Sequence, residues 1–420
     1  MLGSRLTRLA QQSAAQTLGL RAGVVGVNFA VMLGLAALLG FEIFGQLAVL
    51  WGVALVVGTV VSLGGPLILL RMLTDGQGMR ASDITKVALF YPVLLSICAY
   101  TILASVWPAL PWATILGAGV LVNALGCLAS VMRALGSVQI SMALRDAGPP
   151  VALGVAGVLA YGAEAATIMT GAMLVMFVMA LAGAFWVCWH AEIQTILSPV
   201  RRPCWSGSLW ASSVLGMLIA QIDLIVGGAV IPAEQLGVYA ILRRIANLVA
   251  LPVTVATWVS AAPVSAAYGA GNPSALIRAS AQASRIAVLP GLALLTCGVL
   301  AIPLLPYLLP DPSGDGLGLI FAILLMGAFG QVFFAASFGV ATLCNLSGFA
   351  MAARFLMIGL YVLWFQWWGP ALAPLTNALG YVSAITLGGA ALWWAVKRQL
   401  GVDTSAAVLL RAKGGQWKTS

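Results

Sequence analysis

The residues best suited to chemistry are polar side chains inside long apolar stretches. Tyr239, Arg243 and Asn247 recur every four residues, which places them on one face of a helix. Arg244 lies beside this face, and Trp258 continues it. Arg243 would sit about 8 Å below the outer end of its helix. Two interpretations stay open: the arginines line an aqueous cavity, which we favour, or they extend outward to the lipid headgroups.

Three more polar residues occupy membrane depth in other apolar stretches. Asp223 would lie about 12 Å from the outer end of its helix. Because a short loop joins the two helices, Asp223 could approach Arg243 or Arg244. That carboxylate is either half of a structural ion pair or a gate coupled to an ion. Arg21 and Asn28, seven residues apart, share a face of the first apolar stretch and are further candidates for the cavity.

A second polar stripe lies at the predicted inner end of the bundle. Arg278, Gln282 and Arg285 share one helical face. Lys86 occupies the matching place in the first half of the chain. We expect these four residues to attract an anionic headgroup where it enters from the cytoplasm.

The sequence carries no recognisable catalytic constellation. It has one histidine, His190, and lacks an Asp-x-Asp metal pair, a Gly-x-Ser-x-Gly elbow and a phosphate-binding Gly-rich loop with lysine. Its six cysteines include no Cys-x-x-Cys pair. We therefore expect no enzyme activity, no catalytic residue, no cofactor, no metal site and no disulfide.

Composition determines which elements position these residues. The chain has 420 residues, of which 62% are hydrophobic and only 7% charged, whereas a soluble domain carries about 25% charged residues. A helix needs roughly 20 apolar residues to cross a bilayer. The sequence predicts an all-α polytopic membrane protein with about twelve such segments. They cover about 19–39, 46–70, 85–106, 112–132, 149–162, 166–190, 207–231, 238–262, 281–306, 317–341, 350–368 and 374–396.

An internal repeat predicts how these helices are grouped. Gly45 and Ala48 match Gly237 and Ala240, and further matches follow at offsets near 192 to 199. We expect two pseudo-symmetric lobes of six helices with the substrate path between them. The predicted parts are an interfacial N-terminal helix, an N-lobe, a cytoplasmic linker, a C-lobe and a basic cytoplasmic tail, at 1–18, 19–196, 197–206, 207–396 and 397–420.

The charge distribution predicts the orientation. The net charge is +9, and the basic residues gather in the loops on one side. The loops on the other side contain only acidic charges. Cytoplasmic loops carry the excess of Lys and Arg, so both termini are expected in the cytoplasm. This asymmetry explains the net positive charge, so nucleic-acid binding is not needed to explain it.

Two stretches of the sequence resemble a known family. The first stretch resembles the seventh and eighth spans of the polysaccharide-export flippases. It begins at Asp223, continues after thirteen residues with Gly237-x-Tyr239, and ends with an apolar helix at Pro263. Phe44-Gly45 through Pro66 is similar to their second span. These flippases belong to the multidrug/oligosaccharidyl-lipid/polysaccharide (MOP) superfamily. The layout of twelve spans and two lobes extends the resemblance over nearly the whole chain.

The resemblance implies a flippase of the bacterial inner membrane. Such a protein moves an oligosaccharide on a polyprenyl diphosphate from the cytoplasmic to the periplasmic leaflet by alternating access, for O-antigen, capsule or exopolysaccharide synthesis. Membrane lipids, a polysaccharide polymerase and export proteins are the partners it implies. In this sequence, the arginines would neutralise the diphosphate or acidic sugars. Tyr239, Asn28, Asn247 and Trp258 would contact sugar hydroxyls and ring faces.

Two alternatives remain. A cation-coupled multidrug exporter of the same superfamily would favour acidic cavity residues, and here arginines outnumber the deep carboxylate. A membrane polysaccharide polymerase would carry a long basic outer loop. The longest predicted outer segment, about 307–316, is acidic.

Overall fold

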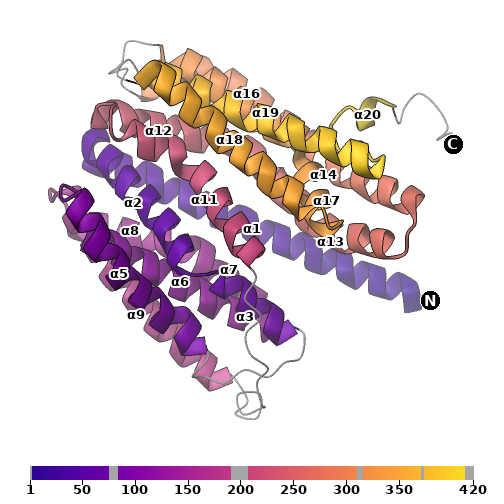
Figure 1. The fold of residues 1–420 in the computed structure, drawn as a ribbon, viewed down its shortest axis with the longest axis horizontal. Helices are drawn as coiled ribbons and strands as arrows, with labels where there is room; N and C mark the ends of the chain where they lie inside the picture. Colours follow the sequence, from indigo (N-terminus) through magenta and orange to yellow (C-terminus); the bar gives the residue numbers. More distant parts are fainter. Residues whose placement is uncertain (1, 75–83, 191–206, 310–315, 370–372, 412–420) are drawn as a thin grey trace. The chain divides into compact units, whose positions relative to one another are not determined.

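The computed structural model describes residues 2–74, 84–190, 207–309, 316–369 and 373–411. Throughout these ranges the chain forms helices and no strands (Figure 1). Eleven of the helices are long and apolar enough to cross a membrane. A helix pairs its own backbone N–H and C=O groups, and this is necessary because the bilayer interior offers them no hydrogen-bond partners. The prediction of an all-α polytopic membrane protein is confirmed.

The chain divides into two compact units, Met1–Gly228 and Ala229–Ser420. The helices of the first unit are α1 (Leu2–Leu39), α2 (Phe41–Val61), α3 (Gly65–Thr74), η1 (Lys86–Phe90), α5 (Tyr91–Val106), α6 (Trp112–Ala134), α7 (Val138–Met142), η2 (Ala143–Ala147), α8 (Gly148–Leu159), α9 (Ala165–His190) and α11 (Gly207–Gly227).

Helix α6 forms the centre of the first unit. It packs against α2, α3, α5 and α9, and most of its residues are buried. A Cβ atom added to Gly58 of α2 would lie 2.7 Å from the backbone oxygen of Gly119 on α6. The two helices therefore cross backbone to backbone, the packing that small residues permit in membranes.

The fifth predicted span, about 149–162, differs from the expectation. Three contiguous stretches, α7, η2 and α8, are helical from Val138 to Leu159, and α8 itself has 12 residues. This segment is not among the eleven long apolar helices because Arg145 and Asp146 interrupt its apolar character. Its middle part, η2, is a π-helix.

The first helix also begins earlier than the first predicted span. The backbone of α1 is one continuous helix from Leu2 to Leu39. It shows no break between the predicted interfacial segment, 1–18, and the first span. The position of 1–18 at a membrane interface stays a prediction.

The second unit contains the remaining helices. They are α12 (Ala233–Asn247), η3 (Leu248–Ala250), α13 (Leu251–Gly269), α14 (Pro273–Ala301), η4 (Ile302–Leu304), α15 (Leu305–Leu308), α16 (Leu317–Phe333), α17 (Ala335–Leu343), α18 (Ser347–Trp368), α19 (Pro374–Leu400) and α20 (Val408–Arg411). Helices α16 and α18 both pack against α19 (Figure 1).

The second and the eighth predicted spans are each interrupted. Residues 62–64 form a turn between α2 and α3, in which Gly64 has a φ of 80°. The 3₁₀ turn η3 separates α12 from α13. Pro252 follows this turn and has no N–H to continue the α-helical hydrogen bonding, which explains the break.

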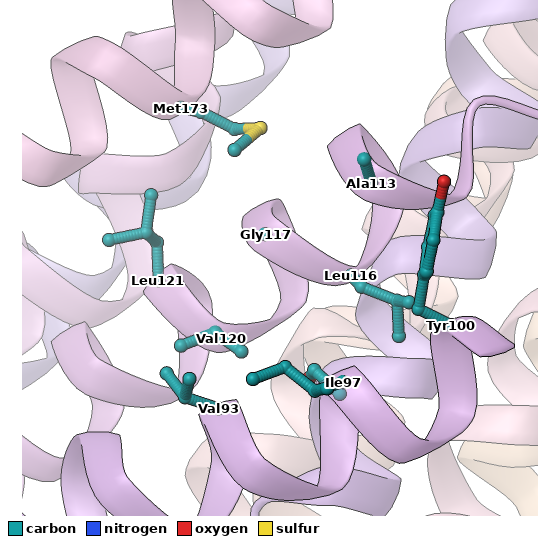
Figure 2. Close-up of a pocket in the computed structure, with 10 residues that line it drawn as sticks. Val93, Ile97, Tyr100, Ala113, Leu116, Gly117, Val120, Leu121 and Met173 are labelled. Carbon is teal, nitrogen blue, oxygen red and sulfur yellow. The ribbon is translucent and has the colours of Figure 1, made fainter.

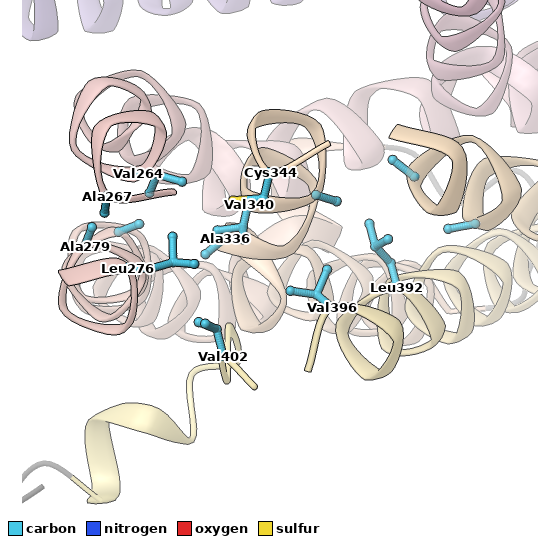
Figure 3. Close-up of a cluster of buried hydrophobic side chains, with 14 residues drawn as sticks. Val264, Ala267, Leu276, Ala279, Ala336, Val340, Cys344, Leu392, Val396 and Val402 are labelled. Atoms are coloured by element: carbon cyan, nitrogen blue, oxygen red, sulfur yellow. The ribbon is translucent and has the colours of Figure 1, made fainter. Parts of the chain in front are cut away.

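Buried side chains of α13, α14, α17, α18 and α19 form one core in the second unit (Figure 3). Val402, from the segment after α19, packs into this core. Asp403 then accepts hydrogen bonds from Trp393 Nε1 at 2.8 Å and from Ser405 Oγ at 2.7 Å, and it lies 3.7 Å from Lys397 Nζ. Burial alone would raise the pKa of Asp403, but these hydrogen bonds and the Lys397 charge hold it below its ordinary value.

The division between the two units falls after α11, and α11 packs against α2 within the first unit. The predicted inter-lobe linker at 197–206 lies outside the described residues, as does the end of the predicted tail at 397–420. The grouping into an N-lobe of 19–196 and a C-lobe of 207–396 stays a prediction.

Candidate functional site

Arg243 is held inside the second unit. It projects from α12, and only 5% of its surface is exposed. Its Nη2 donates a hydrogen bond to the hydroxyl of Tyr381 on α19 at 2.9 Å. Its Cζ also lies 4.8 Å from the centre of the Tyr381 ring. The guanidinium is therefore anchored by a polar contact and a cation–π contact, which argues against a side chain that extends to the headgroups.

The rest of the predicted stripe is divided between two environments. Tyr239 is 1% exposed, whereas Asn247 is exposed at the end of α12. Arg244 is half-buried. The 3₁₀ turn η3 then interrupts the helix before α13, and a single face that continues to Trp258 stays a prediction. The side chain of Trp258 lies outside the described residues.

Asp223 is fully buried in α11 of the first unit. Arg243 and Arg244 belong to the second unit. An approach between this carboxylate and either arginine stays a prediction, as does its role in gating or ion coupling.

Asn28 lies at a contact between α1 and the π-helix η2. Its Nδ2 donates a hydrogen bond to the backbone oxygen of Asp146 at 2.8 Å. In a regular α-helix this oxygen would accept the N–H of residue 150, but Pro150 has none. The proline therefore frees a carbonyl within the apolar bundle, and Asn28 satisfies it. Asn28 Oδ1 is buried and makes no hydrogen bond to the described residues.

Four charged side chains lie on the three helices α1, α6 and η2, of which α1 and α6 each pack against η2. Arg21 of α1 and Arg133 in the last turn of α6 each interact electrostatically with Arg145 and Asp146 of η2. Arg21 and Arg133 also interact with each other. Arg145 Nε lies 3.7 Å from Asp146 Oδ1. We call these four residues the η2 cluster.

Sequence reasoning did not group these residues. It assigned Arg21 to a cavity and counted the other basic residues of the cluster, without naming them, among those of the cytoplasmic loops. The adjacent charges followed by Pro149-Pro150 were a usable signal, because prolines free carbonyls that a polar neighbour must then satisfy. Tyr381 carried no comparable signal.

The residues of the predicted cytoplasmic stripe are exposed. Arg278, Gln282 and Arg285 are all exposed on α14, as their spacing predicts for one helical face. Lys86 is exposed in the π-helix η1. Their role in receiving a headgroup stays a prediction.

A pocket of about 430 Å³ opens between α5, α6 and α9 (Figure 2). Val93, Ile97 and Tyr100 of α5 face Leu116 and Gly117 of α6 across it. Ser96 and the Tyr100 hydroxyl are its polar groups. This chemistry suits a hydrocarbon chain and offers no countercharge to an ionic headgroup.

The fold is that of transporters of the MOP superfamily. An inward-facing multidrug resistance MATE family transporter matches with a TM-score of 0.62 and 15% identity, covering 95% of this chain and 100% of the other. The outward-facing conformation of such a transporter matches at 0.58 and 16%, covering 96% and 97%. The lipid II flippase MurJ, in an inward closed conformation, matches at 0.61 and 13%, covering 96% and 93%. No protein-family model and no curated protein matches the chain.

Proposed function

We propose that this chain is a flippase for a polyprenyl-diphosphate-linked oligosaccharide. It would carry the headgroup across the inner membrane of a bacterium by alternating access, from the cytoplasmic to the periplasmic leaflet. The polysaccharide would be an O-antigen, a capsule or an exopolysaccharide. A polysaccharide polymerase and export proteins would then use the product.

The observation that carries this proposal is the excess of arginine within the spans. Arg21, Arg133, Arg243 and Arg244 lie in spans of the described residues. Counted on the same terms, the carboxylates of these spans are Glu42, Asp223 and Glu234, and basic residues outnumber them. Arg243 and Arg244 lie near the middle of their span. Charges at membrane depth are costly and mark the path of a substrate of opposite charge. An excess of guanidinium groups therefore favours an anionic substrate such as a diphosphate.

The similarity to a lipid II flippase supports a lipid-linked substrate. That protein is a flippase for lipid II, as its name states. In this chain, Arg21, Arg243 and Arg244 would neutralise the diphosphate. Tyr239, Asn28, Asn247 and Trp258 would contact the saccharide. The pocket beside α5 offers a hydrocarbon surface of the kind a lipid tail would meet.

Purified protein in liposomes tests the proposal. A fluorescent oligosaccharide on polyprenyl diphosphate is supplied in the bilayer, and a membrane-impermeant quencher reports which leaflet holds it. We expect the protein to speed the exchange between leaflets relative to protein-free liposomes. A neutral polyprenyl-linked saccharide is the control and should move more slowly. Equal rates with and without the protein would reject the proposal.

A multidrug exporter is the second candidate. The two MATE transporter structures match the chain as well as the flippase does, and the fully buried Asp223 could bind a cation. A drug-sensitivity panel separates the two functions. A strain lacking this protein should keep its resistance to cationic drugs and accumulate lipid-linked saccharide on the cytoplasmic leaflet. Lost resistance without such accumulation would identify the exporter.

A further inference from the structure

The pocket between α5, α6 and α9 lies halfway along the spans that form it. Its lining residues fall within 93–100 on α5 and 113–121 on α6, with Met173 on α9. Ser96 lies ten residues from either end of the span Lys86–Val106, which is about 15 Å of helix in each direction. The apolar core of a bilayer is about 30 Å thick. The pocket therefore sits near the middle of the bilayer, and we call it the midplane pocket.

This depth determines which part of a lipid reaches the midplane pocket. Headgroups stay at the surfaces of the bilayer, and the acyl chains of each leaflet fill about half of the 30 Å core. An acyl chain therefore meets the pocket only with its end. A polyprenyl chain is much longer than one leaflet is thick, so it passes the midplane and can lie along the pocket.

The pocket is accessible from the lipid. Val93, Ile97 and Tyr100 line it and are exposed on α5, and Figure 2 shows Val93 and Ile97 on this wall. Only 22% of the most apolar part of the span that contains α5 is buried, and the same holds for α9. A chain can enter sideways from the bilayer without passing a charged group.

The size of the pocket sets the length of chain that it holds. A cavity of about 150 Å³ holds one benzene molecule. The midplane pocket of about 430 Å³ therefore holds about three groups of that size, or about three isoprene units. Gly117 keeps this space free, because a Cβ atom added there would collide with Cε of Met173.

One polar group in the wall favours a particular kind of chain. A hydrocarbon chain gains little by leaving the equally apolar lipid, so selection requires a more specific contact. Ser96 is 8% exposed, and its Oγ makes no hydrogen bond to the described residues. A saturated chain offers this hydroxyl no acceptor. Each isoprene unit has a double bond, whose π electrons accept a weak hydrogen bond.

We propose that the midplane pocket binds a segment of about three isoprene units of a polyprenyl chain, with the Ser96 hydroxyl donating to one of its double bonds. This inference deepens the proposed function and rests on it for the identity of the lipid. The pocket is thus the place where the tail of the substrate, and not its headgroup, is distinguished from ordinary lipid.

Photochemical labelling of the purified protein tests the inference. The probe is a polyprenol with a diazirine in its chain and with neither phosphate nor sugar, added to nanodiscs of phosphatidylcholine. Mass spectrometry should find the label within 93–121 or at Met173. Unlabelled polyprenol should compete about two- to fivefold better than the same polyprenol fully hydrogenated, the effect of one weak hydrogen bond. No label in the pocket, or equal competition by the two polyprenols, would overturn the inference.

Two hydroxyl variants on the same helix isolate the role of Ser96. Ser96→Ala removes the hydroxyl in the pocket without adding bulk, and should make the two polyprenols compete equally. Ser105→Ala is the matched control, because the Ser105 hydroxyl is exposed and already donates to the Ile102 oxygen at 2.7 Å. It should keep the preference. A preference that persists in Ser96→Ala would exclude the proposed contact.

Two glycine variants test the space itself. Gly117→Leu should fill the pocket and reduce its labelling to the level given by a phosphatidylcholine that carries the diazirine in its acyl chain. Gly359→Leu makes the same change on α18, where an added Cβ meets nothing within 4 Å, and should leave the labelling unchanged. Size-exclusion chromatography identifies the folded variants to be compared. Equal labelling of the wild-type pocket by the phosphatidylcholine probe would mean ordinary lipid and overturn the inference.

The binding assay is independent of the proposed transport. Selective labelling by polyprenol in a protein that moves no saccharide between leaflets would support the pocket and reject the proposed function. Leaflet exchange by a wild-type protein whose pocket takes no label would support the function and overturn the pocket.

Discussion

The contact between Arg243 and Tyr381 gives a prediction whose size follows from its geometry. Both residues are buried, at 5% and 6% exposure. Tyr381→Phe removes the 2.9 Å hydrogen bond but keeps the ring beneath the guanidinium. A hydrogen bond to a charged group is worth about 1.5–3 kcal/mol. Tyr381→Leu also removes the cation–π contact, worth about 2 kcal/mol more when desolvated.

A double-mutant cycle measures this contact. The free energy of unfolding in mixed micelles is determined for Tyr381→Phe, Arg243→Met and the double variant. Arg243→Met keeps most of the length of the side chain and removes its charge. Once Arg243→Met has removed the guanidinium, adding Tyr381→Phe should cost little. We expect an interaction energy of about 1.5–3 kcal/mol. An interaction energy below about 0.5 kcal/mol would mean that the two residues act independently, and that Tyr381 does not hold Arg243.

Three further predictions concern other parts of the fold. Gly58→Leu should destabilise the protein strongly, because any side chain there meets the backbone of Gly119; thermal unfolding in detergent checks this, and unchanged unfolding would refute the close crossing. Because the pKa of Asp403 is lower in the folded protein than the ordinary aspartate value of about 3.9, its carboxylate stabilises the fold above that pH, and this contribution is lost as the pH falls through the folded pKa. Asp403→Asn should remove this contribution, so the free energies of unfolding of the two proteins should differ at neutral pH and converge at low pH. Curves of unfolding free energy against pH that stay parallel would exclude this role. Transport should respond to membrane potential without ATP, since one charge crossing 100 mV is worth about 2.3 kcal/mol; rates unaffected by depolarisation with a potassium ionophore would argue against this driving force.

The sequence was sufficient to predict the class of fold. A helix needs roughly 20 apolar residues to cross a bilayer, and the chain has many such stretches. Because only 7% of its residues are charged, a soluble globular fold is excluded. The seven-residue spacing placed Arg21 and Asn28 on one face of a helix, and both residues lie on the unbroken helix α1. Their place in a cavity stays a prediction. Local spacing on an unbroken helix is information that a sequence carries directly.

The partners of the charged residues could not be predicted in the same way. Tyr381 reaches Arg243 from α19, which is 138 residues away in the chain. The π-helix around Arg145 depends on where two prolines interrupt the hydrogen bonding, and its contact with Asn28 spans 118 residues. The 3₁₀ turn η3 likewise interrupts the helix between Asn247 and Leu251. Such pairings depend on tertiary packing, which periodicity does not encode.

The most direct test of the proposed function is export by a variant without its paired arginines. Arg243→Ala/Arg244→Ala removes two guanidinium groups from α12. The account predicts that this variant folds and inserts into the membrane but no longer moves polyprenyl-diphosphate-linked saccharide between leaflets. Export at the wild-type rate by the folded double variant would contradict the claim that these arginines receive an anionic headgroup.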